Sequence, residues 1–269
     1  MEEVTLKCEV ITPMFMAGAD GKTPELRPSE FKGMMRFWWR AIKAMDKIGE
    51  LRKEEAKIFG GTGTEEGKIF GGTGRGEGKS KISLRLEYDS ESLDGMIKED
   101  IKANYNLNFR YDSNTRTLQG RDSGIGYLLY STILHNRKRK YIKEGFKFNI
   151  IISSFDREYI KQALVSLWLA IYLGGFGTRA RRGGGNIIVN EITGDTFDIG
   201  FNPEGNSNSS VKSWFENNLD RIKRIIPPQE TVKYTTIKNG RVLIFDAKRS
   251  WNEALNFLGE KFLEFRSRN

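Results

Sequence analysis

Residues 156–192 read DREYIKQALVSLWLAIYLGGFGTRARRGGGNIIVNEI, and they contain three kinds of local sequence in succession. The first part, residues 156–173, predicts a helix, because apolar residues recur at helical spacing after Asp156, a residue type that often caps a helix. The last part, residues 186–192, is rich in β-branched residues and predicts a strand. Between them lie six glycines and three arginines in twelve residues, so we expect a glycine-rich loop that faces an anion.

The rest of the chain continues this mixture of strands and helices. The segments that predict strands are residues 4–11, 80–88, 124–134, 144–154 and a hairpin at 232–247 around Asn239-Gly240. The segments that predict helices are residues 29–48, 250–265 and, weakly, 92–104, and a polar linker is expected at 201–210. This order is typical of an α+β protein and is compatible with two ferredoxin-like units. We place the first unit at residues 1–143 and the second, with the glycine-rich loop and the C-terminal helix, at residues 144–269.

Composition favours a polyanionic partner. The 269 residues include 44 lysines and arginines against 35 aspartates and glutamates, a formal net charge of +9, which favours nucleic acid over a membrane surface. No apolar run reaches the roughly 18 residues of a membrane-spanning helix, so we expect neither a transmembrane nor a secretory segment. Cys8 is the single cysteine, which excludes an internal disulfide and fits a reducing cytoplasm.

The heptapeptide KIFGGTG occurs twice, at residues 57–63 and 68–74. Two copies are too few for a repeat architecture, so they indicate either a duplicated exposed loop or a phosphate-binding loop. The overlapping GGTGRGEGKS, residues 71–80, ends like a Walker A motif, but the first glycine of that motif would fall on Thr73. A strand is expected after Ser80, so no helix N-terminus would face a phosphate. These features exclude a nucleoside triphosphatase of this type.

Catalytic constellations are sparse in this chain. His135 is the single histidine, and it lies in HNRKRK, a run typical of a solvated basic turn. Its functional alternative is the general acid and base of a metal-independent ribonuclease. A multi-histidine or cysteine-based metal site has too few ligands, and the aspartates of the polar loops are typical turn formers. We therefore expect no metal and no cofactor.

Four basic residues recur at helical spacing in the helix predicted at residues 29–48: Lys32, Arg36, Arg40 and Lys43. They share one side of that helix, whereas the apolar residues take another side. This side is either an ordinary solvated face or a face that binds RNA phosphates. The flanking Phe37 and Trp39 either stack on bases or pack in the core.

Residues 12–41, TPMFMAGADGKTPELRPSEFKGMMRFWWRA, combine a Gly-Ala-Asp-Gly turn, Lys22, a Glu-Leu-Arg sequence and a helix with Lys-Gly-x-x-Arg-Phe-Trp-Trp-Arg-Ala. This segment resembles the N-terminal signature of the RAMP superfamily of CRISPR proteins, and most of all the family of first-numbered RAMP subunits of type III-B (Cmr) effector complexes. Residues 174–185 resemble the glycine-rich loop of that superfamily. The duplicated KIFGGTG departs from the family pattern, so nothing is carried over to residues 57–79.

The resemblance implies ferredoxin-like domains and a subunit that binds guide RNA and target single-stranded RNA near the 3′ end of the guide. It also implies other RAMP subunits as partners, no membrane, and no nuclease activity, since another subunit cleaves the target. The predicted RNA-contacting residues are Lys22, Lys32, Arg36, Arg40, Lys43, Gly175, Gly177, Arg179, Arg181, Arg182 and Gly184. In the loop, the arginines would bind phosphates and the glycines would let RNA approach backbone N–H groups; the alternative is a flexible, solvated loop.

Three functions follow from this sequence. The favoured one is an RNA-binding structural subunit of a CRISPR interference complex. The second is a RAMP endoribonuclease that processes CRISPR transcripts with His135 as its acid and base. The third is a protein of RNA-recognition-like fold outside CRISPR systems.

Overall fold

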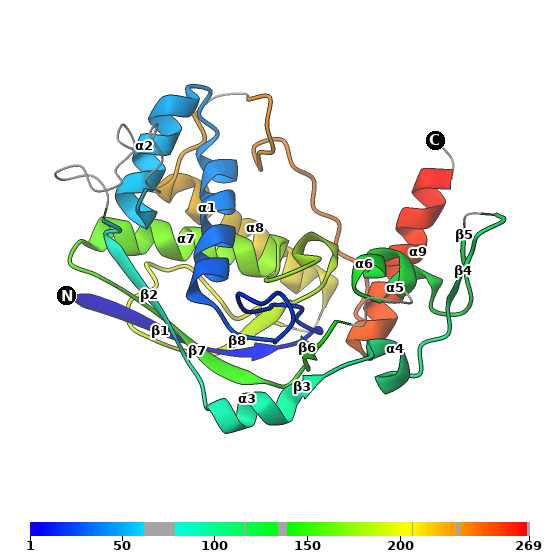
Figure 1. Cartoon of the computed structure of the whole chain (residues 1–269). Coiled ribbons are helices and arrows are strands. Elements are labelled where there is room, and N and C mark those ends of the chain that lie inside the picture. The colour runs from blue at the N-terminus through cyan, green and yellow to red at the C-terminus, as the bar shows by residue number, and fades with distance from the viewer. Residues whose placement is uncertain (62–78, 116, 134–138, 206, 230–231, 268–269) are drawn as a thin grey trace.

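The computed structural model describes residues 1–61, 79–115, 117–133, 139–205, 207–229 and 232–267, and it contains both helices and sheets (Figure 1). The strands are β1 (Glu2–Val10), β2 (Ile82–Glu87), β3 (Ile97–Lys98), β4 (Arg110–Asp112), β5 (Thr117–Gln119), β6 (Tyr141–Ile142), β7 (Lys147–Ser154) and β8 (Ile187–Thr193). The helices are α1 (Pro28–Lys43), α2 (Ile48–Phe59), α3 (Ser90–Met96), α4 (Ile101–Asn104), α5 (Ser123–Leu128), α6 (Tyr130–Ile133), α7 (Arg157–Leu173), α8 (Asn208–Ile225) and α9 (Trp251–Ser267), with a short 3-10 helix, η2 (Ala180–Arg182).

Four strands form one antiparallel sheet in the order β2–β7–β1–β8. In its centre β1 pairs with β7 in a register that places Leu6 beside Ile150. Helix α1 follows β1 and α7 follows β7 in the chain, and the two helices pack together over the same face of the sheet (Figure 1). When the insertions are set aside, the chain runs β1–α1–β2–β7–α7–β8, the strand and helix order of a ferredoxin-like fold.

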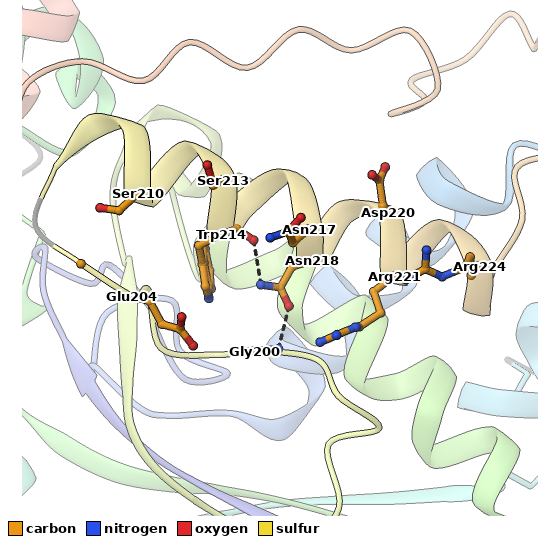
Figure 2. A pocket seen from close by; sticks show the side chains of 11 residues that line it. Gly200, Glu204, Ser210, Ser213, Trp214, Asn217, Asn218, Asp220, Arg221 and Arg224 are labelled. Carbon is orange, nitrogen blue, oxygen red and sulfur yellow. Dashed lines mark hydrogen bonds between the residues drawn. The ribbon is translucent and has the colours of Figure 1, made fainter.

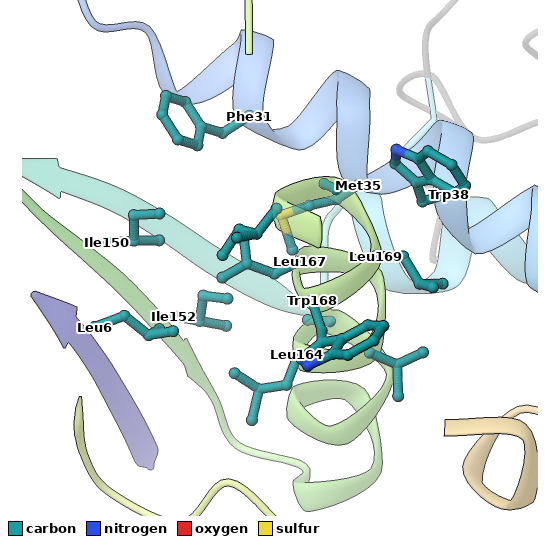
Figure 3. Packing of buried hydrophobic residues seen from close by; sticks show 14 of the residues in the cluster. Leu6, Phe31, Met35, Trp38, Ile150, Ile152, Leu164, Leu167, Trp168 and Leu169 are labelled. Carbon is teal, nitrogen blue, oxygen red and sulfur yellow. The ribbon is translucent and has the colours of Figure 1, made fainter. Parts of the chain in front are cut away.

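The main core lies between this sheet and the two helices (Figure 3). Leu6 and Ile150 from the sheet, Phe31 from α1, and Leu167 and Trp168 from α7 are all fully buried. Full burial of such side chains contributes roughly 1.5–3 kcal/mol each in transfer free energy. Although α7 is apolar around most of its circumference, no helix in the described ranges is both long and apolar enough to cross a membrane.

Local sequence explains where α1 and α7 begin and end. Pro28 occupies the first turn of α1, where its missing N–H leaves no hydrogen bond unmade. At the other end of α1, Ala44 adopts a left-handed conformation with a φ of 49°. Asp156 caps α7 as predicted, because its carboxylate accepts a hydrogen bond of 2.9 Å from the backbone N–H of Glu158.

The α+β class is confirmed, but the division into units of residues 1–143 and 144–269 does not describe the sheet. Strands β1 and β2 precede that boundary and β7 and β8 follow it, yet all four belong to one sheet. The described residues therefore contain one ferredoxin-like sheet rather than one in each half. Pairing between distant segments leaves no local trace in either segment, so periodicity alone placed the boundary wrongly.

The strand predicted at residues 124–134 is also wrong, because its described residues form the helices α5 and α6. Helix α5 lies directly against α9, and two glycines permit this approach. A Cβ at Gly124 would lie 2.1 Å from the carbonyl oxygen of Asn256, and a Cβ at Gly259 would lie 2.1 Å from the carbonyl oxygen of Gly124. The aromatic and β-branched composition of this segment suits its packing against α9, not a ladder of strand hydrogen bonds.

The hairpin predicted at residues 232–247 is a third error. A turn exists there, with the Gly240 N–H bonded to the carbonyl oxygen of Ile237 at 3.2 Å, but no strand flanks it. Two helices were missed, α2 and α8. The α8 helix starts inside the predicted linker, where Ser207 and Ser210 form a reciprocal capping box.

Candidate nucleic-acid interface

The glycine-rich loop, residues 174–185, is a folded element of the protein. Backbone hydrogen bonds join its ends, from the Phe176 N–H to the Gly185 carbonyl oxygen at 2.9 Å. A second bond, of 2.8 Å, runs from the Thr178 N–H to the carbonyl oxygen of Phe15 in the segment that resembles the RAMP signature. The loop is therefore not the flexible, solvated connection that was the alternative prediction.

The glycines of this loop permit close contacts within the chain itself. Gly177 has a φ of +84°, and a Cβ there would lie 2.7 Å from the carbonyl oxygen of Phe15. A Cβ at Gly175 would lie 2.7 Å from the carbonyl oxygen of Gly184, and both of these glycines are buried. RNA was predicted to make this close approach to the glycines, but in the structure the chain's own backbone occupies the space next to them.

The three arginines of the loop lie in η2 and immediately before it. Arg179 adopts a left-handed conformation with a φ of 67°, and its Nε donates a hydrogen bond of 2.7 Å to Ser131 Oγ. Arg181 is exposed and Arg182 is half-exposed. Within the described ranges, no carboxylate forms an ion pair with any of the three. Their positive charge is therefore not neutralised by the described part of the chain.

Aromatic rings hold these guanidinium groups in place. The distances from guanidinium carbon to ring centroid are 4.7 Å for Arg179 over Tyr130, 5.4 Å for Arg181 over Phe37, 5.4 Å for Arg182 over Phe262 and 5.9 Å for Arg182 over Tyr127. Each arrangement is within the range of a cation–π contact. We call these seven residues the arginine–aromatic surface, and they come from α1, α5, α6, η2, α9 and the loop.

Sequence reasoning found only part of this surface. It named Phe37 beside the basic side of the first helix, but it missed Tyr127 and Tyr130 because their segment was interpreted as a strand. Phe262 lies in the helix predicted at residues 250–265, and 48% of this residue is exposed. Trp39, which was named together with Phe37, is fully buried in the core and cannot stack on a base.

The predicted basic face of α1 is largely neutralised inside the molecule. Glu55 of α2, which is 3% exposed, accepts hydrogen bonds from Arg40 at 2.7 and 2.8 Å and also pairs with Arg36. Lys43 pairs with Glu54 at 2.7 Å. Because α2 was not predicted, the sequence offered no partner for these cations. In the structure, two carboxylates of α2 pair with them.

The two other predicted contact residues lie apart from this ion-pair cluster. Lys32 is half-buried, its Nζ donates to Ser80 Oγ at 3.3 Å, and burial lowers the pKa of its ammonium group. Lys22 lies on an exposed turn, where its backbone N–H donates to Asp20 Oδ1 at 2.9 Å. The three loop arginines differ from the α1 cluster, because they share a segment of four residues and pair with no carboxylate of the described residues.

Other chemistry is limited in the described residues. No three histidine, cysteine, aspartate or glutamate side chains gather there as a metal site would require. Burial raises the pKa of the Cys8 thiol far above its ordinary value, so this cysteine is held as a neutral core residue. Ser80 is followed by strand β2, as the rejection of a Walker A motif required. His135 and most of the duplicated KIFGGTG sequence lie outside the described residues.

A cavity of about 680 Å³ lies between α8 and residues 200–205 (Figure 2). Asn218 in the wall of this cavity joins α8 to Gly200. Its Oδ1 accepts a hydrogen bond of 2.6 Å from the Gly200 N–H, and its Nδ2 donates one of 2.9 Å to the carbonyl oxygen of Trp214. None of the residues that line this cavity belongs to the glycine-rich loop. This cavity is therefore separate from the arginine–aromatic surface.

Comparison with known proteins agrees with the resemblance found in the sequence. The family model described as the RAMP superfamily matches residues 7–188. The Cmr subunit Cmr1-2 of Pyrococcus furiosus is 33% identical over 203 residues, which are 70% of this chain and 96% of that protein. The Cmr1-1 subunit of the same organism is 25% identical over 248 residues, 87% of this chain and 63% of that protein.

Solved structures share the fold. The apo crystal structure of Cmr1 from Pyrococcus furiosus superposes with a TM-score of 0.65 at 22% identity, covering 100% of this chain and 73% of that one. A chain in the cryo-EM structure of a type III-B Cmr-beta complex bound to cognate target RNA superposes with a TM-score of 0.52 at 18% identity. This second likeness covers 82% of this chain and 62% of that one.

Proposed function

We propose, because the chain belongs to the RAMP superfamily, that it is an RNA-binding structural subunit of a type III-B CRISPR (Cmr) effector complex. Its partners in this proposal are guide RNA, target single-stranded RNA and other RAMP subunits, with contact near the 3′ end of the guide. The relative of 33% identity is named a Cmr subunit, and a chain of similar fold belongs to a complex bound to target RNA. Both names support this class of assembly.

The observation that carries the proposal is the arginine–aromatic surface. Its three arginines have no carboxylate partner among the described residues, and aromatic faces limit the rotamers of their side chains. A guanidinium group that is already oriented loses less side-chain entropy when it binds a phosphate. Contacts to phosphates position RNA without reading its sequence. The affinity for RNA should therefore depend strongly on salt concentration and only weakly on RNA sequence.

The rings of the same surface suit single-stranded RNA. Tyr130 is 49% exposed and Phe262 is 48% exposed, so each ring keeps area that a base can cover. Unpaired bases stack on such rings with little dependence on base identity. A duplex hides its base faces, so we propose that this surface binds single strands in preference to duplexes.

The test is the affinity of the purified chain for a fluorescein-labelled single-stranded RNA, measured by anisotropy. The variant Arg179→Gln, Arg181→Gln, Arg182→Gln is expected to bind about tenfold or more weakly, since a charge-assisted contact contributes roughly 1.5–3 kcal/mol. The matched control, Lys7→Gln, Arg85→Gln, Lys212→Gln, removes the same charge from exposed cations that pair with carboxylates. Equal loss in both variants would reduce the proposal to a general effect of net charge.

The proposed role is non-catalytic, and the endoribonuclease alternative depends on His135. Incubation of the chain with CRISPR repeat RNA in EDTA separates the two. The proposal expects RNA that is retained and uncut. Site-specific cuts that disappear in His135→Ala would establish the metal-independent ribonuclease instead.

A further inference from the structure

Residues 241–245, RVLIF, have the composition of a strand but no strand partner in the structure. A hairpin was predicted there, because the run is apolar and partly β-branched. In the described structure, no backbone N–H or carbonyl group of residues 241–248 forms a hydrogen bond. The orange trace between α8 and α9 in Figure 1 accordingly contains no arrow.

The chain on both sides of this segment is anchored. Upstream, the N–H groups of Gln229 and Ile237 donate to the carbonyl oxygens of Lys43 and Ala41, each at 3.1 Å. These bonds satisfy carbonyl groups that the end of α1 leaves free. Downstream, α9 packs against α5. Residues 241–245 are therefore an unpaired run held between two fixed ends.

The side chains of this run are unusually exposed for their type. Leu243 is 76% exposed, Val242 is 46% exposed and Phe245 is 44% exposed. A groove of about 480 Å³ separates the run from α8, where Phe215 and Leu219 form part of its wall. Apolar side chains next to unpaired backbone groups are the combination that natural proteins cover with another strand.

Basic residues flank the apolar run on both sides in the chain. Lys238, Arg241, Lys248 and Arg249 are all exposed, and none pairs with a carboxylate of the described residues. Asp246, the acidic residue that directly follows the run, accepts a hydrogen bond from Asn208 Nδ2 at 2.5 Å. A complementary partner therefore carries acidic side chains on both sides of its apolar residues.

We infer that residues 241–245 pair with an extended strand of another protein, one in which acidic residues flank an apolar stretch. In this mode the backbone hydrogen bonds supply affinity, and the groove beside α8 selects apolar side chains. A single-stranded RNA fits this run less well. Valine, leucine and isoleucine offer no ring on which a base can stack, and the one ring of the run, Phe245, packs edge to face against Phe257 of α9 with ring centroids 5.4 Å apart. The inference goes beyond the proposed function, because it concerns a protein partner and does not require the arginine–aromatic surface.

The experiment uses the full chain and a short capped peptide in which valine and threonine alternate between aspartates at both ends. Hydrogen exchange of the free chain should show fast exchange at residues 241–245, and saturating peptide should slow it at these amides. The control peptide has the same side chains but is N-methylated at alternate residues. It therefore lacks the backbone N–H donors on one side of the extended peptide. It should bind about tenfold or more weakly, because several backbone hydrogen bonds are lost together.

Two variants at one position separate backbone pairing from side-chain contact. Leu243→Pro removes an N–H donor and should weaken peptide binding about tenfold or more. Leu243→Thr keeps the donor and a strand-forming residue, so it should retain most of the affinity. Thermal melts of both variants should match the parent, because the described structure contains no backbone hydrogen bond of residues 241–248.

Each other outcome overturns the inference. Equal affinity for the N-methylated peptide, or absence of protection at 241–245, excludes strand pairing with an acidic partner. Protection that rises with protein concentration alone indicates a second copy of the chain, and protection by RNA alone indicates nucleic acid. The Arg179→Gln, Arg181→Gln, Arg182→Gln variant should bind the peptide like the parent. A result that overturns the strand-pairing inference can therefore be distinguished from one that overturns RNA binding by the arginine–aromatic surface.

Discussion

The glycine-rich loop and helix α1 both carry several basic residues, and the structure treats their charges in opposite ways. On α1, Arg36 and Arg40 share the buried carboxylate of Glu55. In the loop, Arg181 and Arg182 face aromatic rings and pair with no carboxylate of the described residues. Arg36, Arg40 and Lys43 of the helix are therefore neutralised within the molecule, whereas no carboxylate of the described residues neutralises the loop arginines.

From this difference we expect a phosphate to bind where guanidinium groups have no carboxylate partner, rather than where basic residues are most numerous. A phosphate that bound Nη1 of Arg40 would have to replace its contacts to Glu55 at 2.7 and 2.8 Å, and it would leave that buried carboxylate with Arg36 alone. Breaking a buried pair in this way costs several kcal/mol. A cation–π contact at a half-exposed site contributes only about 0.5–1 kcal/mol and leaves the N–H donors of the guanidinium group free to bind.

The largest expected effect concerns the frame that holds the loop arginines. At Gly185, with a φ of +65°, a Cβ would lie 1.9 Å from the carbonyl oxygen of Phe176. We expect Gly185→Ala to lower the free energy of unfolding by about 3 kcal/mol or more, from positive φ and overpacking together. The measurement is urea unfolding.

The control for this prediction is Gly21→Ala. Gly21 has a φ of +67°, but nothing lies within 4 Å of the position of its Cβ. Only the conformational cost remains there, roughly 1–2 kcal/mol. Equal destabilisation by the two substitutions would contradict the account of a loop fixed by close backbone contact.

The second prediction addresses the neutralised face of α1. Glu55→Gln leaves two guanidinium groups without their shared carboxylate, and we expect it to destabilise the protein by about 2 kcal/mol, below the usual cost of a buried pair because Arg36 and Arg40 keep some exposure. Glu54→Gln removes a carboxylate that is 38% exposed, so its cost should stay within about 0.5 kcal/mol. Thermal melts of the two variants provide the comparison.

The Glu55→Gln variant also sharpens the contrast between helix and loop. If internal pairing is what keeps the α1 arginines from RNA, their release should leave RNA affinity unchanged or raise it. A fall in affinity while the variant remains folded would mean that the ion-pair cluster itself orients an RNA-binding group.

The third and smallest effect concerns the rings of the arginine–aromatic surface. Phe262→Leu and Tyr130→Leu each remove a ring that faces an arginine, and each should weaken single-stranded RNA binding by about 1 kcal/mol, roughly fivefold. Phe155→Leu is the control, because that ring is 90% exposed and contacts none of the loop arginines in the described structure. Equal losses for all three substitutions would leave no special role for the surface.

Local sequence predicted the elements whose signals are local. The apolar stripe of α1, the Asp156 cap of α7 and the β-branched run of β8 each lie within one segment, and each was found. The order of the strands in the sheet was not predicted, because β1 pairs with β7 and β8, which lie far from it in the chain. Single-segment patterns carry no information about such pairing, and the boundary at 143 was misplaced for that reason.

The candidate site divides in the same way. The clustered glycines and arginines of residues 174–185 identified the loop, but not why its glycines are needed, because the contact to Phe15 joins distant segments. The basic spacing on α1 was correct as a pattern, but it gave no sign of the pairing with Glu55, because Glu55 comes from a helix that was missed. Contact between these residues and RNA stays a prediction. Tyr127 and Phe262 meet Arg182 only in the folded chain.

The most direct test compares the salt dependence of RNA binding in two variants. One is Arg179→Gln, Arg181→Gln, Arg182→Gln, and the other is Arg36→Gln, Arg40→Gln, each measured at a temperature where its melt shows a folded protein. The account predicts that the slope of log affinity against log salt falls by about 2 in the loop variant, roughly 0.7 per lost phosphate contact, and stays at the parent value in the helix variant. An unchanged slope in the loop variant, or an equal fall in the helix variant, would contradict the assignment of RNA binding to the glycine-rich loop.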